Sequence, residues 1–416
     1  MGTGTDSLGT SRRKSLVATR REDIEQMKLH LLVVTGVLLV LGLVALFSAS
    51  TAPLAAAGRY PYSIILRQCA FIAAGLVLMG LTARAILPPM SDAMLKFSSR
   101  VAFVLTLVLL LAVNFTPLGP EINGAHRWIR LGGFQFQPAE FLKITTILFI
   151  AAVLLGPKAR QAFTTFRTEQ GKTLTVPRNR LRMAFVYFGC VAALGLVVIQ
   201  PDLGSTGIVL FVMLATLTLT GVPMRSILKF LLVLVMLGAA GYFVAPQKYS
   251  YAVERIATAL DPMSDVSGSG YQIVQSLGAI NKGGLLGRGY MNSLQKMNRL
   301  PLQDRDFIFA VWVEEMGMVG GLLVIGLFLY FAFLTLRIST LLPFSFESVV
   351  VVALGFTVSF QALINIATNV GVLPVSGLTL PFFSSGGTSM IVSLLSVGII
   401  LGLVNRQLRR ASRTQA

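Results

Sequence analysis

The residues with the clearest capacity for chemistry stand in "RLPLQDRDFIFAVWVEEMG", residues 299–317, where two aspartates immediately precede a long apolar run. Asp306 lies at the start of that run, where burial and neighbouring charges can adjust the pKa of a carboxylate that acts as a general base. The alternative is a helix N-cap, in which the acid accepts backbone N–H groups, and the residue pattern alone favours it. Asp304 is the competing acid, and we expect it to be a solvated loop charge paired with Arg305.

Charged residues in or beside other apolar runs are further candidates. Glu140 and Lys143 in "FQPAEFLKI" are three residues apart, which predicts one helix face. Such a pair is either a helix-stabilising ion pair or part of a polar pocket, since charges at membrane depth are costly and often functional. Asp202 follows Pro201 in "IQPDLGST", a pattern that is typical of a helix start.

Basic residues in three other segments are candidates for contact with a phosphate group or for anchoring at the membrane surface. Arg67 is expected near the outer end of an apolar run, where it either snorkels to the headgroups or binds phosphate with two N–H groups. Arg127 precedes Trp128, and its alternative role is that of a membrane-interface anchor. Lys282 and Arg288 belong to "AINKGGLLGRG", which has no Walker pattern. Its glycines predict tight turns, and contact with a lipid diphosphate is the bolder interpretation.

These candidates belong to a membrane protein. The 416 residues are 54% hydrophobic and 12% charged, about half the charged fraction of a soluble domain. Backbone groups in lipid must be satisfied within their own segment, so we predict an all-α polytopic membrane protein with ten transmembrane helices of about 20 residues. The expected spans are about 30–50, 63–83, 99–116, 139–156, 182–200, 204–222, 226–246, 307–337, 347–371 and 386–404.

Basic residues predict the orientation of these spans. They are concentrated in the tail 1–29, the loop 157–181 and the tail 406–416, which therefore lie in the cytoplasm with both termini inside. The membrane domain is 30–405, and 247–306 is a large extracytoplasmic loop between helices 7 and 8. The net charge of +18 follows from this asymmetry and does not indicate nucleic acid. We expect the extreme termini to be disordered.

Five segments of the chain, in this order, make it resemble the SEDS family (shape, elongation, division and sporulation), which includes FtsW, RodA and SpoVE. They are "GAHRWIRLGGFQFQPAEFLKI", "QPDLGST", "GSGYQIVQSLGAINKGGLLGRG", "LPLQDRDFIFAVWVEEMG" and "LPVSGLTLPFFSSGGTSM". The resemblance runs from about residue 30 to 405, and "NSLQK" and "GLTLPF" look more like FtsW than RodA.

The resemblance implies a peptidoglycan glycosyltransferase that polymerises lipid II at the outer face of the bacterial cytoplasmic membrane, for division or for cell shape. The family's catalytic aspartate stands immediately before "FIF", so the resemblance assigns the general base to Asp306. The implied partners are lipid II, the undecaprenyl-diphosphate-linked glycan, a class B penicillin-binding protein and other divisome or elongasome membrane proteins. The candidate substrate-binding residues are Arg67, Arg127, Glu140, Lys143, Asp202, Lys282, Arg288 and Asp304. Of these, Arg67, Arg127, Lys143 and Arg288 are the candidates to offset the diphosphate charge. Mg or Mn would be the natural cation at a diphosphate, but no ligand cluster indicates its site.

The chain departs from the family pattern beside the catalytic aspartate. Leu302, Asp304 and Arg305 stand where the pattern "LPE-x-HTDFIF" has Glu, His and Thr, and Ser385 stands where a Tyr is usual. Asp304 is expected to raise the pKa of Asp306 and Arg305 to offset that effect. In that case the catalysis by Asp306 is retuned, Asp304 shares the role of base, or this chain is a weak enzyme. Two other functions remain open, a lipid II flippase and a scaffold for a penicillin-binding protein.

Overall fold

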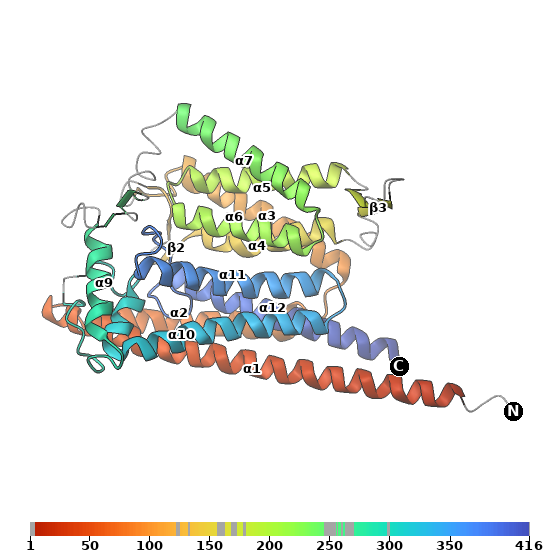
Figure 1. Ribbon diagram of the computed structural model, residues 1–416, viewed down its shortest axis with the longest axis horizontal. Coiled ribbons are helices and arrows are strands. Elements are labelled where there is room, and N and C mark those ends of the chain that lie inside the picture. The colour runs from red at the N-terminus through yellow and green to blue at the C-terminus, as the bar shows by residue number, and fades with distance from the viewer. Residues whose placement is uncertain are drawn as a thin grey trace.

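The computed structural model describes residues 5–121, 125–131, 134–155, 163–167, 173–177, 180–244, 255, 257–258, 261–262, 270–297 and 300–415. Within these residues the chain is predominantly helical (Figure 1). The helices are α1 (Thr5–Ala56), α2 (Ser63–Leu81), the π-helix η1 (Thr82–Ile86), α3 (Asp92–Phe115), α4 (Pro138–Leu154), α5 (Arg180–Val198), α6 (Leu203–Leu219), α7 (Met224–Val244), α9 (Tyr271–Gly283), α10 (Ile308–Leu341), α11 (Phe346–Asn369) and α12 (Gly387–Gln415).

Each of the ten predicted spans coincides with one of these helices. Eight helices in the described part of the chain are long and apolar enough to cross a membrane, which confirms a helical membrane protein. The other two predicted spans are α4 and α6, with 17 residues each. Because a crossing takes about 20 residues, ten complete crossings stay a prediction.

The two ends of the bundle differ in what they carry (Figure 1). The start of α1, the end of α12 and β3 lie at one end, whereas α9 and β2 lie at the other. β3 (Phe163–Arg167) pairs antiparallel with β4 (Thr173–Pro177), and β1 (Ile129–Leu131) with β2 (Phe134–Phe136). This is the arrangement that the predicted orientation requires, because β3 and β4 belong to the predicted inner loop and α9 to the outer loop.

The terminal segments are more ordered than the sequence suggested. α1 begins at Thr5 and α12 continues to Gln415, so the prediction of disordered ends is wrong for these residues. Strong helix formers in "REDIEQMKL" explain the continuation of α1, and Lys28 forms an ion pair with Glu25 one turn earlier, at 2.7 Å.

α4, α11 and α12 form the centre of the bundle. Most side chains of α4 are buried, as are 78% of the apolar window of α11 and 83% of that of α12. α7 and α2 lie at the periphery, with only 11% and 17% of their windows buried. Their exposed apolar side chains fit a lipid environment, and the polar side chains of a site must therefore lie on the central helices.

α10 is interrupted at Gly317, two residues after the second of its two buried acids, Glu314 and Glu315. Gly317 has a φ of 72°, and a Cβ there would lie 2.3 Å from the carbonyl oxygen of Leu285. The glycine-rich segment 284–289 runs along this break, where the backbone N–H of Arg288 donates to the carbonyl of Glu314 at 3.0 Å. Glu315 forms a buried ion pair with Lys296 at 2.7 Å. The tight turns predicted for this segment are confirmed, and they fix the predicted outer loop against α10.

Candidate active site

Asp306 lies in the turn that leads into α10, and its carboxylate does not cap that helix. The N-cap residue is Phe307, without a side-chain hydrogen bond. The cap comes instead from α11, where Asn369 Oδ1 accepts from the backbone N–H of Ala310 at 3.1 Å. The N-cap interpretation of Asp306 is therefore wrong, because a distant residue satisfies the helix start. Among the described residues no side chain or backbone group is hydrogen-bonded to the Asp306 carboxylate.

Two amides of α11 hold the backbone of Asp306. Asn365 Nδ2 and Asn369 Nδ2 donate to the Asp306 carbonyl at 2.8 and 2.9 Å. Asn365 Nδ2 also donates to the carbonyl of Leu378 at 2.6 Å, which ties the same turn to the loop that precedes α12. The turn is thus fixed through its backbone, and the carboxylate stays available for chemistry.

The electrostatic surroundings suit a base. Asp306 is half-buried, and burial raises its pKa to about 7. Arg305 lowers this pKa, Asp304 and Asp202 raise it, and Arg255 lowers it. The opposing effects of Asp304 and Arg305 are those that the sequence predicted. A base with a pKa near the working pH combines a usable ionised fraction with a strong affinity for the proton.

The segment 376–386, which we call the α12 entry loop, binds the turn that carries the two aspartates. Ser384 Oγ donates to the carbonyl of Arg305 at 2.6 Å, and the backbone N–H of Ser385 donates to the carbonyl of Asp304 at 2.9 Å. Ser385 Oγ donates to Asp304 Oδ2 at 2.6 Å. The expected ion pair between Asp304 and Arg305 is not among the ion pairs of the described residues, because Asp304 turns inward to the serine. Two departures from the family pattern, at 304 and 385, are therefore in direct contact.

Three helices position the α12 entry loop. Gln68 Nε2 of α2 donates to the carbonyl of Ser384 at 3.1 Å. A Cβ at Gly42 of α1 would lie 2.1 Å from the carbonyl oxygen of Phe382, and one at Gly204 of α6 would lie 2.2 Å from that of Ser376. Only glycine permits these backbone approaches, so both positions help to set the height of the loop above the bundle.

Glu140 and Lys143 form a buried ion pair that reaches the same loop. Lys143 Nζ lies 2.7 Å from Glu140 Oε2 and donates to Gln361 Oε1 of α11 at 2.6 Å. Gln361 Nε2 in turn donates to the carbonyl of Thr379 at 3.0 Å. The chain of contacts joins α4, α11 and the α12 entry loop, so the pair is both an ion pair and part of a polar network.

Asp202 and Arg127 are engaged in local structure. Asp202 is the N-cap of α6, accepting from the backbone N–H and the Oγ of Ser205 at 3.0 and 2.8 Å, which confirms the predicted helix start. Arg127 donates from Nε to the carbonyl of Gln200 at 2.9 Å and from Nη2 to that of Pro201 at 2.5 Å. Arg127 thus holds the turn that places Asp202 in the electrostatic field of Asp306.

Three predicted basic residues lie outside these contacts. The side chains of Arg67, Lys282 and Arg288 are exposed, and in the described part of the chain none is hydrogen-bonded or ion-paired with the residues around Asp306. Within the same residues no group of three or more His, Cys, Asp or Glu could hold a metal ion.

The amides of α11 were not among the candidate residues predicted from the sequence. Gln361, Asn365 and Asn369 are spaced by four residues, which places them on one helix face, and all three are buried. Their signal was readable, since amides repeating every four residues in an apolar span indicate a polar face directed at protein.

Comparison with known proteins identifies the family to which this chain is similar. The FtsW/RodA/SpoVE family model, described as "Cell cycle protein", matches residues 29–409. The chain is 35% identical over 386 residues to the probable peptidoglycan glycosyltransferase FtsW of Thiomicrospira cyclica, covering 92% of this chain and 93% of that one. It is 31% identical over 382 residues to stage V sporulation protein E of Bacillus subtilis, covering 90% and 96%.

Among the solved structures that share the fold are the two that follow. One belongs to a peptidoglycan synthase complex, described by the words "Structural coordination of polymerization and crosslinking"; its matching chain has a TM-score of 0.70 and 28% identity, with 91% of this chain and 97% of that chain covered. The other is the rod shape determining protein RodA of Thermus thermophilus, with a TM-score of 0.61 and 27% identity over 91% and 96% of the two chains.

Proposed function

The chain belongs to the FtsW/RodA/SpoVE family of cell cycle proteins, and from this premise we propose how it uses the site around Asp306. Its activity is that of a peptidoglycan glycosyltransferase of the bacterial inner membrane, in division or in cell shape.

In the proposed reaction Asp306 is the general base. It removes the proton from the 4-hydroxyl of the GlcNAc of an incoming lipid II as that oxygen attacks C1 of MurNAc at the reducing end of the growing glycan. The bond between C1 and the diphosphate oxygen breaks, and undecaprenyl diphosphate leaves with the bonding electrons. A single carboxylate suffices because the diphosphate is a good leaving group, unlike the sugar oxygen that a glycosidase must protonate.

The observation that supports this proposal most strongly is that the Asp306 backbone is held by hydrogen bonds whereas its carboxylate is not. The Asp306 carbonyl accepts two amide hydrogen bonds, whereas its carboxylate has no hydrogen-bond partner among the described residues, and its pKa of about 7 suits proton transfer at neutral pH. An acid with a purely structural role would be expected to accept hydrogen bonds from a helix start or to pair with a cation.

The other candidate residues have roles in support of Asp306. We assign Asp304 and Asp202 to tuning its pKa, and the Glu140–Lys143 pair to holding the α12 entry loop. The exposed cations Arg67, Lys282 and Arg288 remain candidates to offset the diphosphate charge. A divalent cation would serve the same end, with the diphosphate itself as the main ligand.

We also propose the finer features of the fold and the assembly. These are ten crossings with both termini in the cytoplasm, a membrane domain over 30–405, and a class B penicillin-binding protein that cross-links the new glycan. The similar chain of the peptidoglycan synthase complex, in which polymerization and crosslinking are coordinated, supports such a partner.

The distribution of charge favours polymerisation over transport of lipid II. Asp202 and Asp306 lie just before α6 and α10, and Glu140 lies in the first turn of α4, at the end of the bundle that holds α9. A transporter typically places such residues near the middle of the membrane. The observed position is that of chemistry at the membrane surface.

The test is polymerisation of purified lipid II by the full chain in liposomes, with and without a cognate class B penicillin-binding protein. Glycan strands resolved on a gel are expected, with greater length in the presence of the partner. Movement of fluorescent lipid II between leaflets without any polymer would instead support a flippase, and neither activity would leave a scaffold.

A further inference from the structure

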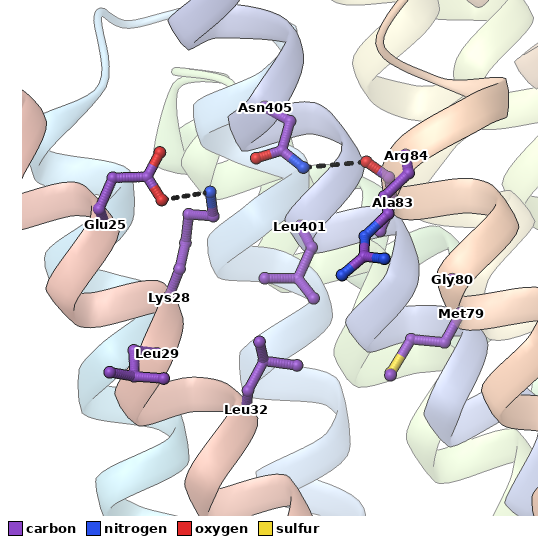
Figure 2. A pocket seen from close by; sticks show the side chains of 10 residues that line it. All are labelled: Glu25, Lys28, Leu29, Leu32, Met79, Gly80, Ala83, Arg84, Leu401 and Asn405. Atoms are coloured by element: carbon purple, nitrogen blue, oxygen red, sulfur yellow. Dashed lines mark hydrogen bonds and ion pairs between the residues drawn. The ribbon is translucent and has the colours of Figure 1, made fainter.

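A cavity of about 410 Å³ lies between α1, the end of α2 with η1, and α12 (Figure 2). It is at the end of the bundle where α1 begins and α12 ends (Figure 1). A second recess of about 520 Å³ shares Glu25, Arg84 and Asn405 with it, so the two are continuous. This space is far along the helices from Asp306, and the proposed reaction does not use it.

The deep part of the cavity is apolar. Leu29 and Leu32 of α1, Met79 of α2 and Leu401 of α12 line it, and the two leucines of α1 are 59% and 39% exposed. Figure 2 shows Leu32 and Leu401 in the space between α1 and α12. A Cβ at Gly80 would meet nothing within 4 Å, so the wall is open at this point as well.

The shallow part of the cavity is cationic. Four basic side chains and one acid line the two recesses, a net charge of +3, and the acid Glu25 is already paired with Lys28. The guanidinium groups of Arg21, Arg84 and Arg409 have no hydrogen bond or ion pair with any side chain that the structure describes. Such a group of unpaired arginines attracts an anion that can accept several hydrogen bonds at once.

The wall that carries Arg84 has an unusual backbone. Residues 82–86 form the π-helix η1, and Asn405 Nδ2 donates to the carbonyl of Ala83 at 2.9 Å (Figure 2). π-Helical turns within α-helices are frequent at functional sites. Here the bond from α12 fixes the turn next to Arg84.

The lining of this cavity changes from cationic near the end of the bundle to apolar deeper among the helices. α1 enters the bundle from Arg21 to Leu32, eleven residues, or about 16 Å of helix. α12 runs the opposite way, from Leu401 to Arg409, so on both walls the cations lie toward the chain termini and the apolar side chains lie deeper. A phospholipid has the same polarity, with a phosphate at the surface and acyl chains below.

We propose that this cavity binds an anionic glycerophospholipid of the cytoplasmic leaflet, with its phosphate at Arg21, Arg84 and Arg409 and one acyl chain against Leu29, Leu32 and Leu401. The leaflet follows from the predicted orientation of the chain. Basic pockets between transmembrane helices on the cytoplasmic side suit anionic headgroups. The bound chain fills the gap beside α1 and so holds α1 against α12.

The test measures lipid binding to the delipidated full chain in detergent by native mass spectrometry. Dioleoyl phosphatidylglycerol is compared with dioleoyl phosphatidylcholine, which has the same chains without net charge, and with glycerol 3-phosphate, which has no chains. We expect the phosphatidylglycerol adduct to dominate. Equal retention of the two lipids, or equal retention of glycerol 3-phosphate, would overturn the proposal.

Matched variants locate the binding. Each basic residue near an anionic lipid contributes about fivefold, so Arg84→Ala with Arg409→Ala should weaken phosphatidylglycerol binding about 25-fold. Arg225→Ala with Arg337→Ala removes two exposed arginines from the same end of the bundle but outside the cavity, and should leave binding unchanged. Equal binding by the two double variants would contradict the assigned site.

A second pair of variants tests the apolar part without changing charge. Gly80→Leu should fill the cavity and reduce binding of both lipids, whereas Gly326→Leu on the exposed face of α10, where a Cβ also meets nothing within 4 Å, should not. This pair decides the question even if the arginine variants do not fold. Unchanged binding by Gly80→Leu would place the lipid elsewhere.

Discussion

The pH dependence of polymerisation reports on the charge that faces Asp306. A general base must be deprotonated, so the rate falls as the pH falls through its pKa, which burial raises to about 7. Asp304 contributes to this elevation because its own negative charge disfavours ionisation of Asp306. Asp304→Asn should therefore shift the acidic limb of the pH–rate profile to lower pH, and keep the enzyme active where the wild type has lost activity.

The spacing of the two acids sets the size of the shift. Two residues of chain place their Cα atoms at most roughly 7 Å apart. If the two carboxylates are taken at about that separation, their unit charges repel by about 0.6 kcal/mol in water and about 2.4 kcal/mol at an effective dielectric constant of about 20. These energies correspond to about 0.4 and 1.7 pKa units. Since both acids are half-buried, we expect a shift of about one unit.

The assay is the initial rate of lipid II polymerisation between pH 5 and 9, in liposomes with the cognate penicillin-binding protein. Asp23→Asn is the matched control, since it removes the same charge from an exposed position in the N-terminal half of α1, away from the end of the bundle that holds α9. It should leave the profile unchanged. An acidic limb that stays in place in Asp304→Asn, or moves to higher pH, would refute the electrostatic account of Asp306.

Three further predictions concern the support of the site. Asn369→Ala removes four side-chain hydrogen bonds of 2.8 to 3.3 Å. It should lower the free energy of unfolding by about 2 to 4 kcal/mol and the polymerisation rate at least tenfold, measured on the same preparation. Lys143→Met leaves Glu140 buried without its cation, which should lower the free energy of unfolding by about 3 to 5 kcal/mol. Adding Glu140→Gln should restore most of the melting temperature. No recovery would mean that the loss comes from packing and not from the unpaired charge. Because folding raises the pKa of Asp306, the cost of ionising it in the folded state is fully present above about pH 7 and absent below about pH 4. Asp306→Asn should therefore raise the melting temperature by roughly 2 to 4 °C at pH 8 and by less at pH 5. An equal gain at both pH values would count against the raised pKa.

The sequence was sufficient for features that depend on local pattern. Apolar runs of about 20 residues located the helices, because length and hydropathy are properties of each segment alone. The glycines of "NKGGLLGRG" indicated tight turns, and Asp202 indicated the start of α6, since caps and turns involve neighbours in the chain. The ends at Thr5 and Gln415 were underestimated because helix propensity continued the spans beyond their apolar parts.

Features that depend on distant partners were beyond the sequence. Asp306 looked like an N-cap because the capping group of α10, Asn369, lies 63 residues further along the chain. Asp304 looked solvated because its partner Ser385 lies 81 residues away, in the α12 entry loop. The role of Asp306 as a base was predicted from the resemblance to a family, and the structure explains why its carboxylate does not cap α10.

The measurement that tests the central claim most directly compares Asp306→Asn with Asp304→Asn in polymerisation of purified lipid II, with the cognate class B penicillin-binding protein present. The two variants remove one negative charge each, two residues apart, and both keep the size of the side chain. We predict glycan strands from the wild type and from Asp304→Asn, and none from Asp306→Asn. Strands from Asp306→Asn at the wild-type rate would contradict the assignment of the base, whatever the other variants show.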